Sequence, residues 1–234
     1  MLTTMKKHIP NGVTCLNLFS GCLGIVYAFQ GELKLASYAI LAAAIFDFLD
    51  GLLARLLKAY SDIGKQLDSL ADVVSFGVLP SVLIYQLFLQ SPQEGLLSTW
   101  INYSAFLIAV FSALRLAKFN IDVRQSENFI GLPTPANALL ISSFPFIIDQ
   151  DSLASYILNP YFLLLFSIIM GILLVSEIPL ISLKFKNIEL KQNILRYILV
   201  FSSLVLLVLF KFAAVPLIII VYFLISFIQF RSVK

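Results

Sequence analysis

Apolar residues along the chain gather into eight runs, each long enough to cross a lipid bilayer as a helix. Inside hydrocarbon a helix satisfies its own backbone polar groups, and about 17–25 mostly apolar residues are needed to span it. Polar or turn-forming residues, such as those at 91–95 and 149–151, separate the runs. The pattern predicts an all-α polytopic membrane protein with spans near 12–30, 34–57, 67–91, 101–120, 134–149, 156–180, 193–210 and 213–230.

The composition strengthens this prediction and excludes other classes of protein. Of 234 residues, 60% are hydrophobic and 12% are charged, whereas ordinary soluble domains contain about 25% charged residues. Intrinsic disorder, a secreted disulfide scaffold and a nucleic-acid module are therefore excluded. The net charge of +3 is too small to indicate a polyanionic partner. We expect the bilayer to be a partner and expect no nucleic acid.

The basic residues predict how the chain is oriented. If the N-terminus is cytoplasmic, the eight spans place all but Lys34 and Lys211 of the 16 Lys and Arg residues on the cytoplasmic side. Such an excess is typical of the cytoplasmic loops of membrane proteins. Both termini are therefore predicted to lie in the cytoplasm.

Four aspartates stand out because they lie within the second and third apolar runs: Asp47, Asp50, Asp68 and Asp72. An aspartate at mid-membrane costs about 2.5–3.5 kcal/mol on insertion scales, so a group of them needs a compensating cation, partner or water. The i, i+3 and i, i+4 spacings put each pair on one helix face. A short connection makes the two helices antiparallel neighbours, so we expect the four carboxylates to meet near the cytoplasmic boundary.

The chemistry of this group favours hard divalent cations. The cluster contains carboxylate oxygens and neither His nor Cys, which suits Mg²⁺ or Mn²⁺ and not zinc or copper. Carboxylates that keep such ions partly open to water are usual partners of phosphates. Two ions about 3.5–4 Å apart can stabilise both the attacking and the leaving oxygen of a displacement at phosphorus. The cluster therefore predicts phosphate chemistry.

Small and basic residues accompany the aspartates. Gly51 and Ala54 lie on the same helix face as Asp47 and Asp50, and Arg55 follows directly. Small residues permit close approach either of a ligand or of another helix. Arg55 either meets a phosphate or extends to the membrane interface. By themselves these residues do not decide between a binding site and helix packing.

Taken together, these residues resemble the signature of the CDP-alcohol phosphotransferase family. The match covers all eight fixed positions, in the order Asp47-x-x-Asp50-Gly51-x-x-Ala54-Arg55 and then Gly64-x-x-x-Asp68-x-x-x-Asp72. The resemblance implies a six-helix core, assigned to residues 1–180, with an additional C-terminal pair of helices in 181–234. It also implies a homodimer that displaces CMP from a CDP-linked lipid with the hydroxyl of an alcohol.

The resemblance assigns roles residue by residue. Two divalent cations, Mg²⁺ or Mn²⁺, are expected on Asp47, Asp50, Asp68 and Asp72, with Asp72 also the general base. Gly51, Ala54, Arg55 and Ser61 match positions that hold the CDP part of the donor.

Three further stretches are similar to one branch of the family, the bacterial membrane-embedded phosphatidylserine synthases. They are Ile9-Pro10-Asn11 with Thr14, Asn17-Leu18-Phe19 and Gly21, then residues 68–80, then Arg115 to Asn120 followed by Gly131-Leu132-Pro133-Thr134-Pro135. This similarity implies transfer of a phosphatidyl group from CDP-diacylglycerol to L-serine. It also implies an active site on the cytoplasmic side of the bacterial cytoplasmic membrane.

The first and third stretches provide further candidate binding residues. Asn11, Thr14 and Asn17 lie on one helix face and are expected to contact the cytosine or ribose, although helix capping and interhelical hydrogen bonding explain them equally well. The candidates for the serine site are Arg115, Lys118 and Arg124 for the carboxylate and Asn120 for the amino group. The alternative for the basic residues is contact with lipid headgroups.

Two other functions compete with this one. The same chemistry would serve another acceptor, such as glycerol phosphate or inositol phosphate. A phosphorylated acceptor needs more cationic charge in its pocket than serine does, so the modest basic cluster between Arg115 and Arg124 mildly favours serine. An ion-coupled transporter also carries acids within the membrane. Transporters usually contain internal repeats, and none is detected in this sequence.

Overall fold

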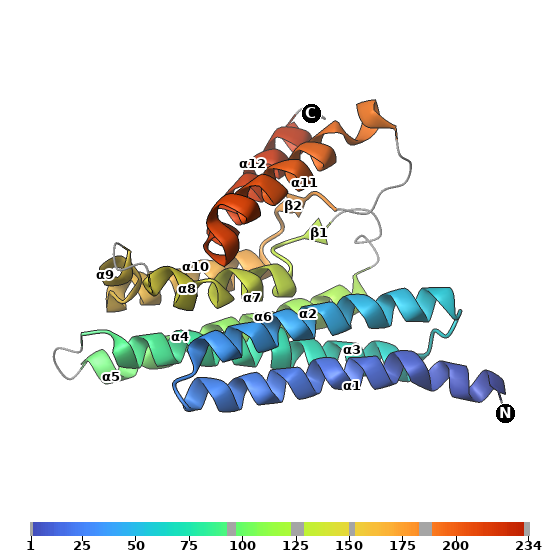
Figure 1. Cartoon of the computed structure of the whole chain (residues 1–234), viewed down its shortest axis with the longest axis horizontal. Helices are drawn as coiled ribbons and strands as arrows, with labels where there is room; N and C mark the ends of the chain where they lie inside the picture. Colours follow the sequence, from blue (N-terminus) through green and yellow to red (C-terminus); the bar gives the residue numbers. More distant parts are fainter. Residues whose placement is uncertain (1, 93–96, 123–128, 150–152, 183–188, 232–234) are drawn as a thin grey trace.

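The computed structural model describes residues 2–92, 97–122, 129–149, 153–182 and 189–231 (Figure 1). The long helices of the first half are α1 (Leu2–Phe29), α2 (Leu33–Leu56), α3 (Asp62–Asp72), α4 (Leu79–Gln90) and α6 (Leu107–Ile121). They run lengthwise side by side (Figure 1). The π-helical segment η1 (Val73–Val78) joins α3 to α4, so that residues 62–90 form one continuous rod.

The second half adds shorter helices and a C-terminal hairpin. Its elements are β1 (Phe129–Ile130), α7 (Thr134–Ser142), α8 (Phe144–Ile148), α9 (Ala154–Ile157), α10 (Pro160–Val175), β2 (Pro179–Leu180), α11 (Leu190–Phe210), η3 (Lys211–Ala214) and α12 (Val215–Arg231); α5 (Leu97–Asn102) and the short 3₁₀ segment η2 (Tyr103–Phe106) precede α6. Helix α7 packs on α2, η1, α4 and α6, and α10 packs on α6. The α11–α12 hairpin is inclined to the long helices of the first half (Figure 1).

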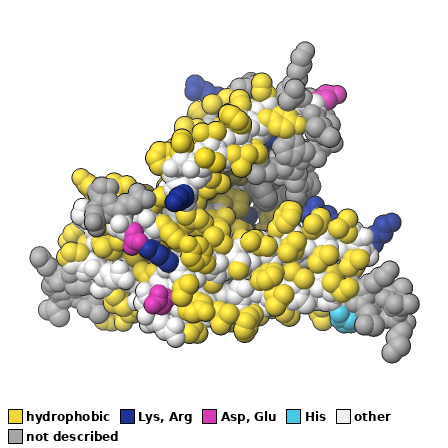
Figure 2. All heavy atoms as spheres, viewed as in Figure 1, with side chains coloured by type: hydrophobic (Ala, Val, Ile, Leu, Met, Phe, Trp, Pro, Cys, Tyr) yellow, Lys and Arg dark blue, Asp and Glu magenta, His cyan; other side chains and the backbone are white. Residues whose placement is uncertain are grey.

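The prediction of an all-α membrane protein is confirmed. In the described part of the chain, four helical stretches are long and apolar enough to cross a membrane: His8–Phe29, Asp62–Gln90, Trp100–Ile121 and Asn193–Arg231. Two shorter apolar helices cover Thr134–Ile148 and Pro160–Val175. Hydrophobic side chains cover much of the visible face (Figure 2), as expected of a surface in contact with lipid. The count of eight spans stays a prediction.

Two predicted spans are divided by local breaks, and a third break falls between the last two predicted spans. The run 156–180 splits at Asn159, whose Oδ1 accepts hydrogen bonds from the backbone N–H groups of Tyr161 and Phe162 and so caps α10. The run 134–149 splits at Ser143, with Pro145 in the first turn of α8. The last two runs separate at Lys211, whose φ of 52° lies outside helical backbone. Capping residues and proline explain the first two breaks.

The core lies where α2, η1, α4, α6 and α7 meet. Its fully buried side chains include Ile40, Phe76, Leu83, Ile108 and Ile141. Close approach of α1 to η1 depends on Gly21, because a Cβ atom there would lie 2.5 Å from Ser75 Oγ. Helix α1 also contacts α3 and α4, so the rod 62–90 packs against α1 along its length.

The connection between α2 and α3 sets the two acidic helices side by side. Helix α2 ends with hydrogen bonds from Lys58 N to Arg55 O and from Ala59 N to Ala54 O, the paired arrangement of a Schellman motif. Lys58 is the residue of this motif that adopts the left-handed conformation, with a φ of 49°. Ser61 then caps α3 by accepting a hydrogen bond from Gly64 N at 3.0 Å.

Candidate active site

Three of the four aspartates form a compact group. Asp47 and Asp50 come from α2 and Asp68 from α3, and one carboxylate oxygen of each lies within 4.8 Å of the other two. Asp68 Oδ1 is buried and has no hydrogen-bond partner. An all-carboxylate donor set with a buried unpaired oxygen fits a hard divalent cation, which would also relieve the repulsion among the charges.

Asp72 lies next to this group, at the end of α3. Its carboxylate is buried and interacts electrostatically with Asp47, Asp68 and Asp50. Asn17 Nδ2 of α1 donates a hydrogen bond of 3.1 Å to Asp72 Oδ1. Ser75 Oγ donates to the backbone oxygen of Asn17 at 3.0 Å, which fixes α1 against η1. The orientation of Asp72 is thereby determined by α1.

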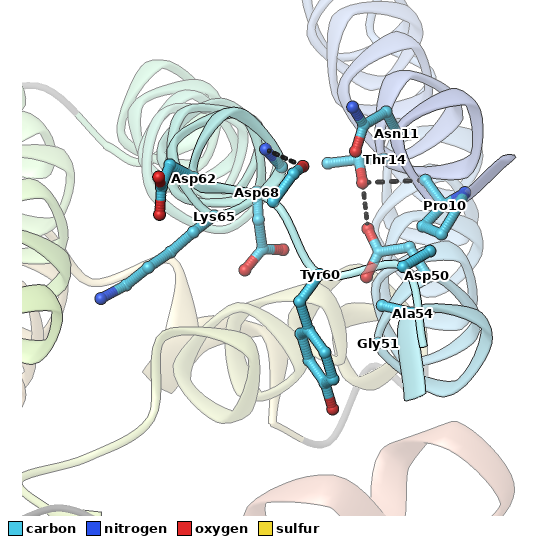
Figure 3. Close-up of a pocket in the computed structure, with 13 residues that line it drawn as sticks. Pro10, Asn11, Thr14, Asp50, Gly51, Ala54, Tyr60, Asp62, Lys65 and Asp68 are labelled. Atoms are coloured by element: carbon cyan, nitrogen blue, oxygen red, sulfur yellow. Dashed lines mark hydrogen bonds between the residues drawn. The ribbon is translucent and has the colours of Figure 1, made fainter. Parts of the chain in front are cut away.

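Thr14 connects α1 to the metal-binding candidates in the same way. Its hydroxyl donates a hydrogen bond of 2.5 Å to Asp50 Oδ2, and it lies 3.1 Å from the backbone oxygen of Pro10 (Figure 3). Thr14 and Asp50 are both buried. Asn17 and Thr14 therefore orient one acid each, and for Thr14 this is the interhelical hydrogen bonding that the sequence left open as the alternative to nucleotide contact.

A cavity of about 530 Å³ opens beside the aspartates, between α1, α2 and α3 (Figure 3). Asp50 projects into it from α2 and Asp68 from α3. Its lining includes five of the residues predicted to hold the donor: Asn11, Thr14, Gly51, Ala54 and Ser61. This volume is within the range of pockets for small molecules and cofactors.

Two glycines give the cavity its shape. A Cβ atom on Gly51 would meet only Arg55 Nη2, at 3.9 Å, so this part of α2 faces open space. A Cβ atom on Gly64 would lie 2.9 Å from Asn11 Oδ1 and 2.9 Å from Ser61 Oγ. Gly64 thus lets α1 and the start of α3 approach each other closely.

Two predicted donor-binding residues lie elsewhere. Asn17 is not among the residues that line the cavity and instead contacts Asp72. Arg55 is exposed, and its Nε donates a hydrogen bond of 3.0 Å to Gly51 O. This bond holds the guanidinium beside Gly51, which lines the cavity.

The structure adds lining residues that the sequence analysis missed, chiefly Tyr60 and Lys65. Lys65 Nζ also donates a hydrogen bond to Asn120 O at 3.0 Å. Helix spacing could have identified Lys65, which lies three residues before Asp68 on the same face. No sequence pattern indicated Tyr60, because it lies in the connection between the two helices.

The residues predicted to bind serine fall into different environments. Arg115 is buried, donates through Nη1 to Thr134 Oγ1 at 3.3 Å, and interacts electrostatically with Asp72. Lys118 is exposed. Asn120 Nδ2 donates to Ser69 Oγ at 2.8 Å. Arg124 lies outside the described residues. Of the described candidates, Arg115 is thus the one that is both buried and in electrostatic interaction with one of the four aspartates.

Comparison with known proteins shows which family this chain is similar to. The family model described as CDP-alcohol phosphatidyltransferase matches residues 7–183. A CDP-diacylglycerol–serine O-phosphatidyltransferase of Helicobacter pylori is 34% identical over 198 residues, which cover 84% of this chain and 80% of the relative. A protein of the same name from Methanocaldococcus jannaschii is 39% identical and covers 73% and 72% of the two chains. One from Bacillus subtilis is 38% identical and covers 60% and 77%.

Proposed function

The chain belongs to the CDP-alcohol phosphatidyltransferase family, and we propose that it transfers the phosphatidyl group of CDP-diacylglycerol to the hydroxyl of L-serine. The products are phosphatidylserine and CMP. The observation that carries this function is the group formed by Asp47, Asp50 and Asp68, of which Asp50 and Asp68 line a cavity large enough for a small-molecule ligand. Relatives that bear the name of this activity cover most of the chain.

The family is metal-dependent in general, and the carboxylate group fits such an ion. We propose two ions, Mg²⁺ or Mn²⁺, with Asp47, Asp50, Asp68 and Asp72 as ligands. When bound, they supply Lewis-acid stabilisation of charge on the pyrophosphate. Thr14 holds Asp50 in position for this task through its hydrogen bond.

The donor is proposed to bind with its CDP part in the cavity. Gly51 provides room for it on α2, and Asn11 and Ser61, which both lie beside Gly64, offer polar contacts. Arg55, beside Gly51, is positioned to meet a phosphate oxygen. The acyl chains would remain in the bilayer.

Asp72 is proposed as the general base. It accepts the proton of the serine hydroxyl, and the serine oxygen forms a bond to the β-phosphorus. The bond from this phosphorus to the bridging oxygen breaks, and CMP leaves. The hydrogen bond from Asn17 leaves the second Asp72 oxygen available for the proton.

The remaining assignments follow from the charge distribution and the family. We propose that both termini and the active site face the cytoplasm, because nearly all Lys and Arg residues then lie on that side. The proposed location is the bacterial cytoplasmic membrane, and the proposed assembly is a homodimer. We also propose that residues 1–180 form the catalytic core and 181–234 an added pair of helices.

The identity of the acceptor is tested with the purified protein. It is given CDP-diacylglycerol, Mg²⁺ or Mn²⁺, and one labelled alcohol at a time. Label should enter lipid with serine and not with glycerol phosphate or inositol phosphate, and CMP should be released in equal amount. Incorporation of a phosphorylated alcohol in place of serine would overturn the assignment. CMP release in detergent, without a membrane gradient, distinguishes an enzyme from a transporter.

A further inference from the structure

Buried polar atoms without partners gather around this site. In the described part of the chain, seven buried side-chain atoms have no hydrogen-bond partner. Two of them belong to Asn17 and Asp68 of the site already described. Four more are Ser112 Oγ, Arg115 Nε and both amide atoms of Asn137, and the seventh is Ser104 Oγ in η2. Because a buried polar atom without a partner is destabilising, such a group indicates a ligand that completes its hydrogen bonds.

These four atoms come from two neighbouring helices that meet beside Asp72. Arg115 of α6 donates to Thr134 of α7. Ser112 precedes Arg115 by one turn and Asn137 follows Thr134 by one turn, so both lie on the helix faces that share this contact. Ser112 and Asn137 have no solvent exposure at all. The three unsatisfied side chains therefore belong to one buried polar region.

Contacts with η1 place this region next to the proposed base. Both α6 and α7 pack on η1, the segment that directly follows Asp72. Ser112 faces it, since a Cβ atom on Gly77 would lie 3.1 Å from Ser112 Cβ. None of the three side chains lines the cavity at Gly51. Asp72 thus interacts with the metal-binding candidates and with Arg115 of this second region.

The chemistry of the region matches an α-amino acid. A free amino acid brings a carboxylate, which needs hydrogen-bond donors, and an ammonium, which needs acceptors. Arg115 Nε is a charged donor, whereas Asn137 Oδ1 and Ser112 Oγ are neutral acceptors. A phosphorylated alcohol carries more negative charge and no ammonium, so one cation and two neutral groups would suit it poorly.

We propose that Asn137 and Ser112 bind the ammonium of the acceptor amino acid while Arg115 binds its carboxylate, which directs the acceptor hydroxyl to Asp72. This inference rests on the proposed function and adds the residues that select the acceptor. Asn137 supplies the amide contact that the sequence analysis had assigned to Asn120, whose side chain donates to Ser69.

The test compares Asn137→Ala and Ser112→Ala with the unchanged protein, using the full chain purified in detergent. Initial rates are measured against serine and against CDP-diacylglycerol, and 3-hydroxypropanoate, which is serine without its amino group, serves as a competitive inhibitor. Asn102→Ala and Ser104→Ala are matched controls, because both residues lie in the α5–η2 segment and outside the proposed sites.

Loss of a hydrogen bond to a charged group should raise the KM for serine about 10- to 100-fold in Asn137→Ala. The KM for CDP-diacylglycerol and the inhibition constant of 3-hydroxypropanoate should stay unchanged, because neither involves the ammonium. Ser112→Ala should change the same constant in the same direction. Neither control should alter the KM for serine.

Two results would overturn the inference while the proposed function stands. One is an unchanged KM for serine in both variants. The other is an equal weakening of serine and 3-hydroxypropanoate, which would indicate a structural role. If Asn137→Ala does not fold, Ser112→Ala decides by the same measurements. If the unchanged protein makes no phosphatidylserine, the proposed function fails and the inference fails with it.

Discussion

The rod formed by α3, η1 and α4 differs from the C-terminal hairpin of α11 and α12 in hydropathy and in burial. The two differences run in opposite directions. The most apolar 18-residue window of the hairpin stretch Asn193–Arg231 has a mean hydropathy of 2.9, and that of the rod Asp62–Gln90 has 1.7. Yet the most apolar window of the rod is 67% buried inside the protein, against 11% for the hairpin. The more hydrophobic element is thus the more exposed one.

The solvent explains this difference. Lipid tails are as apolar as leucine, so hydrophobic side chains gain little by leaving the membrane for the protein interior. Polar side chains gain much more, because inside the bundle they find partners or ligands. Asp72 and Ser75 of the rod are buried and bonded to α1. In this protein, polar residues within apolar helices therefore mark the interior and the site.

The largest expected effect comes from replacing an aspartate of the rod. Asp68→Ala should abolish turnover together with its stimulation by Mg²⁺ or Mn²⁺, because a proposed ligand is lost. Folding should be retained, since fewer carboxylates then repel one another. The control is Asp149→Ala, which removes an exposed partner of Lys34. Turnover is measured across a titration of Mg²⁺ or Mn²⁺. If the ion still fully stimulated Asp68→Ala, the assignment of Asp68 as a ligand would be wrong.

A smaller effect is expected when the base is replaced by its amide. Asp72→Asn should lower kcat by about 10²–10⁴-fold, the usual weight of proton transfer. The amide oxygen can still accept the hydrogen bond from Asn17, so the thermal unfolding temperature should hardly change. Steady-state kinetics and a melting curve check both statements. Unchanged kcat would remove Asp72 from the mechanism.

The smallest effect is expected in the hairpin. Tyr222 OH donates a hydrogen bond of 3.0 Å to Ile181 O and ties α12 to the preceding segment. Tyr222→Phe removes this bond at a cost of about 1 kcal/mol, which lowers Tm by roughly 2–4 °C for a chain of this size. The KM for CDP-diacylglycerol should be unaffected.

The exposed Tyr156 provides the matched control, since it is 70% exposed. Tyr156→Phe should leave Tm where it is. If Tyr222→Phe lost as much turnover as Asp72→Asn, the proposed functional difference between the hairpin and the rod would be wrong.

The sequence by itself determined the membrane class, the main helical runs and the acid faces of α2 and α3. These features are local, because helix periodicity fixes which residues share a face and hydropathy fixes which segments enter lipid. For the same reason, Asp47, Asp50 and Asp68 could be expected to meet across one short connection, as they do.

Only the tertiary structure decided which partner each polar residue has. It placed Asn17 on Asp72, Asn120 on Ser69, and Arg115 beside Thr134. It also brought Ser112 and Asn137 into one buried region without partners. These contacts join helices that are distant in the sequence, and their pairing depends on how whole helices pack against one another. Local spacing carries no information about that packing.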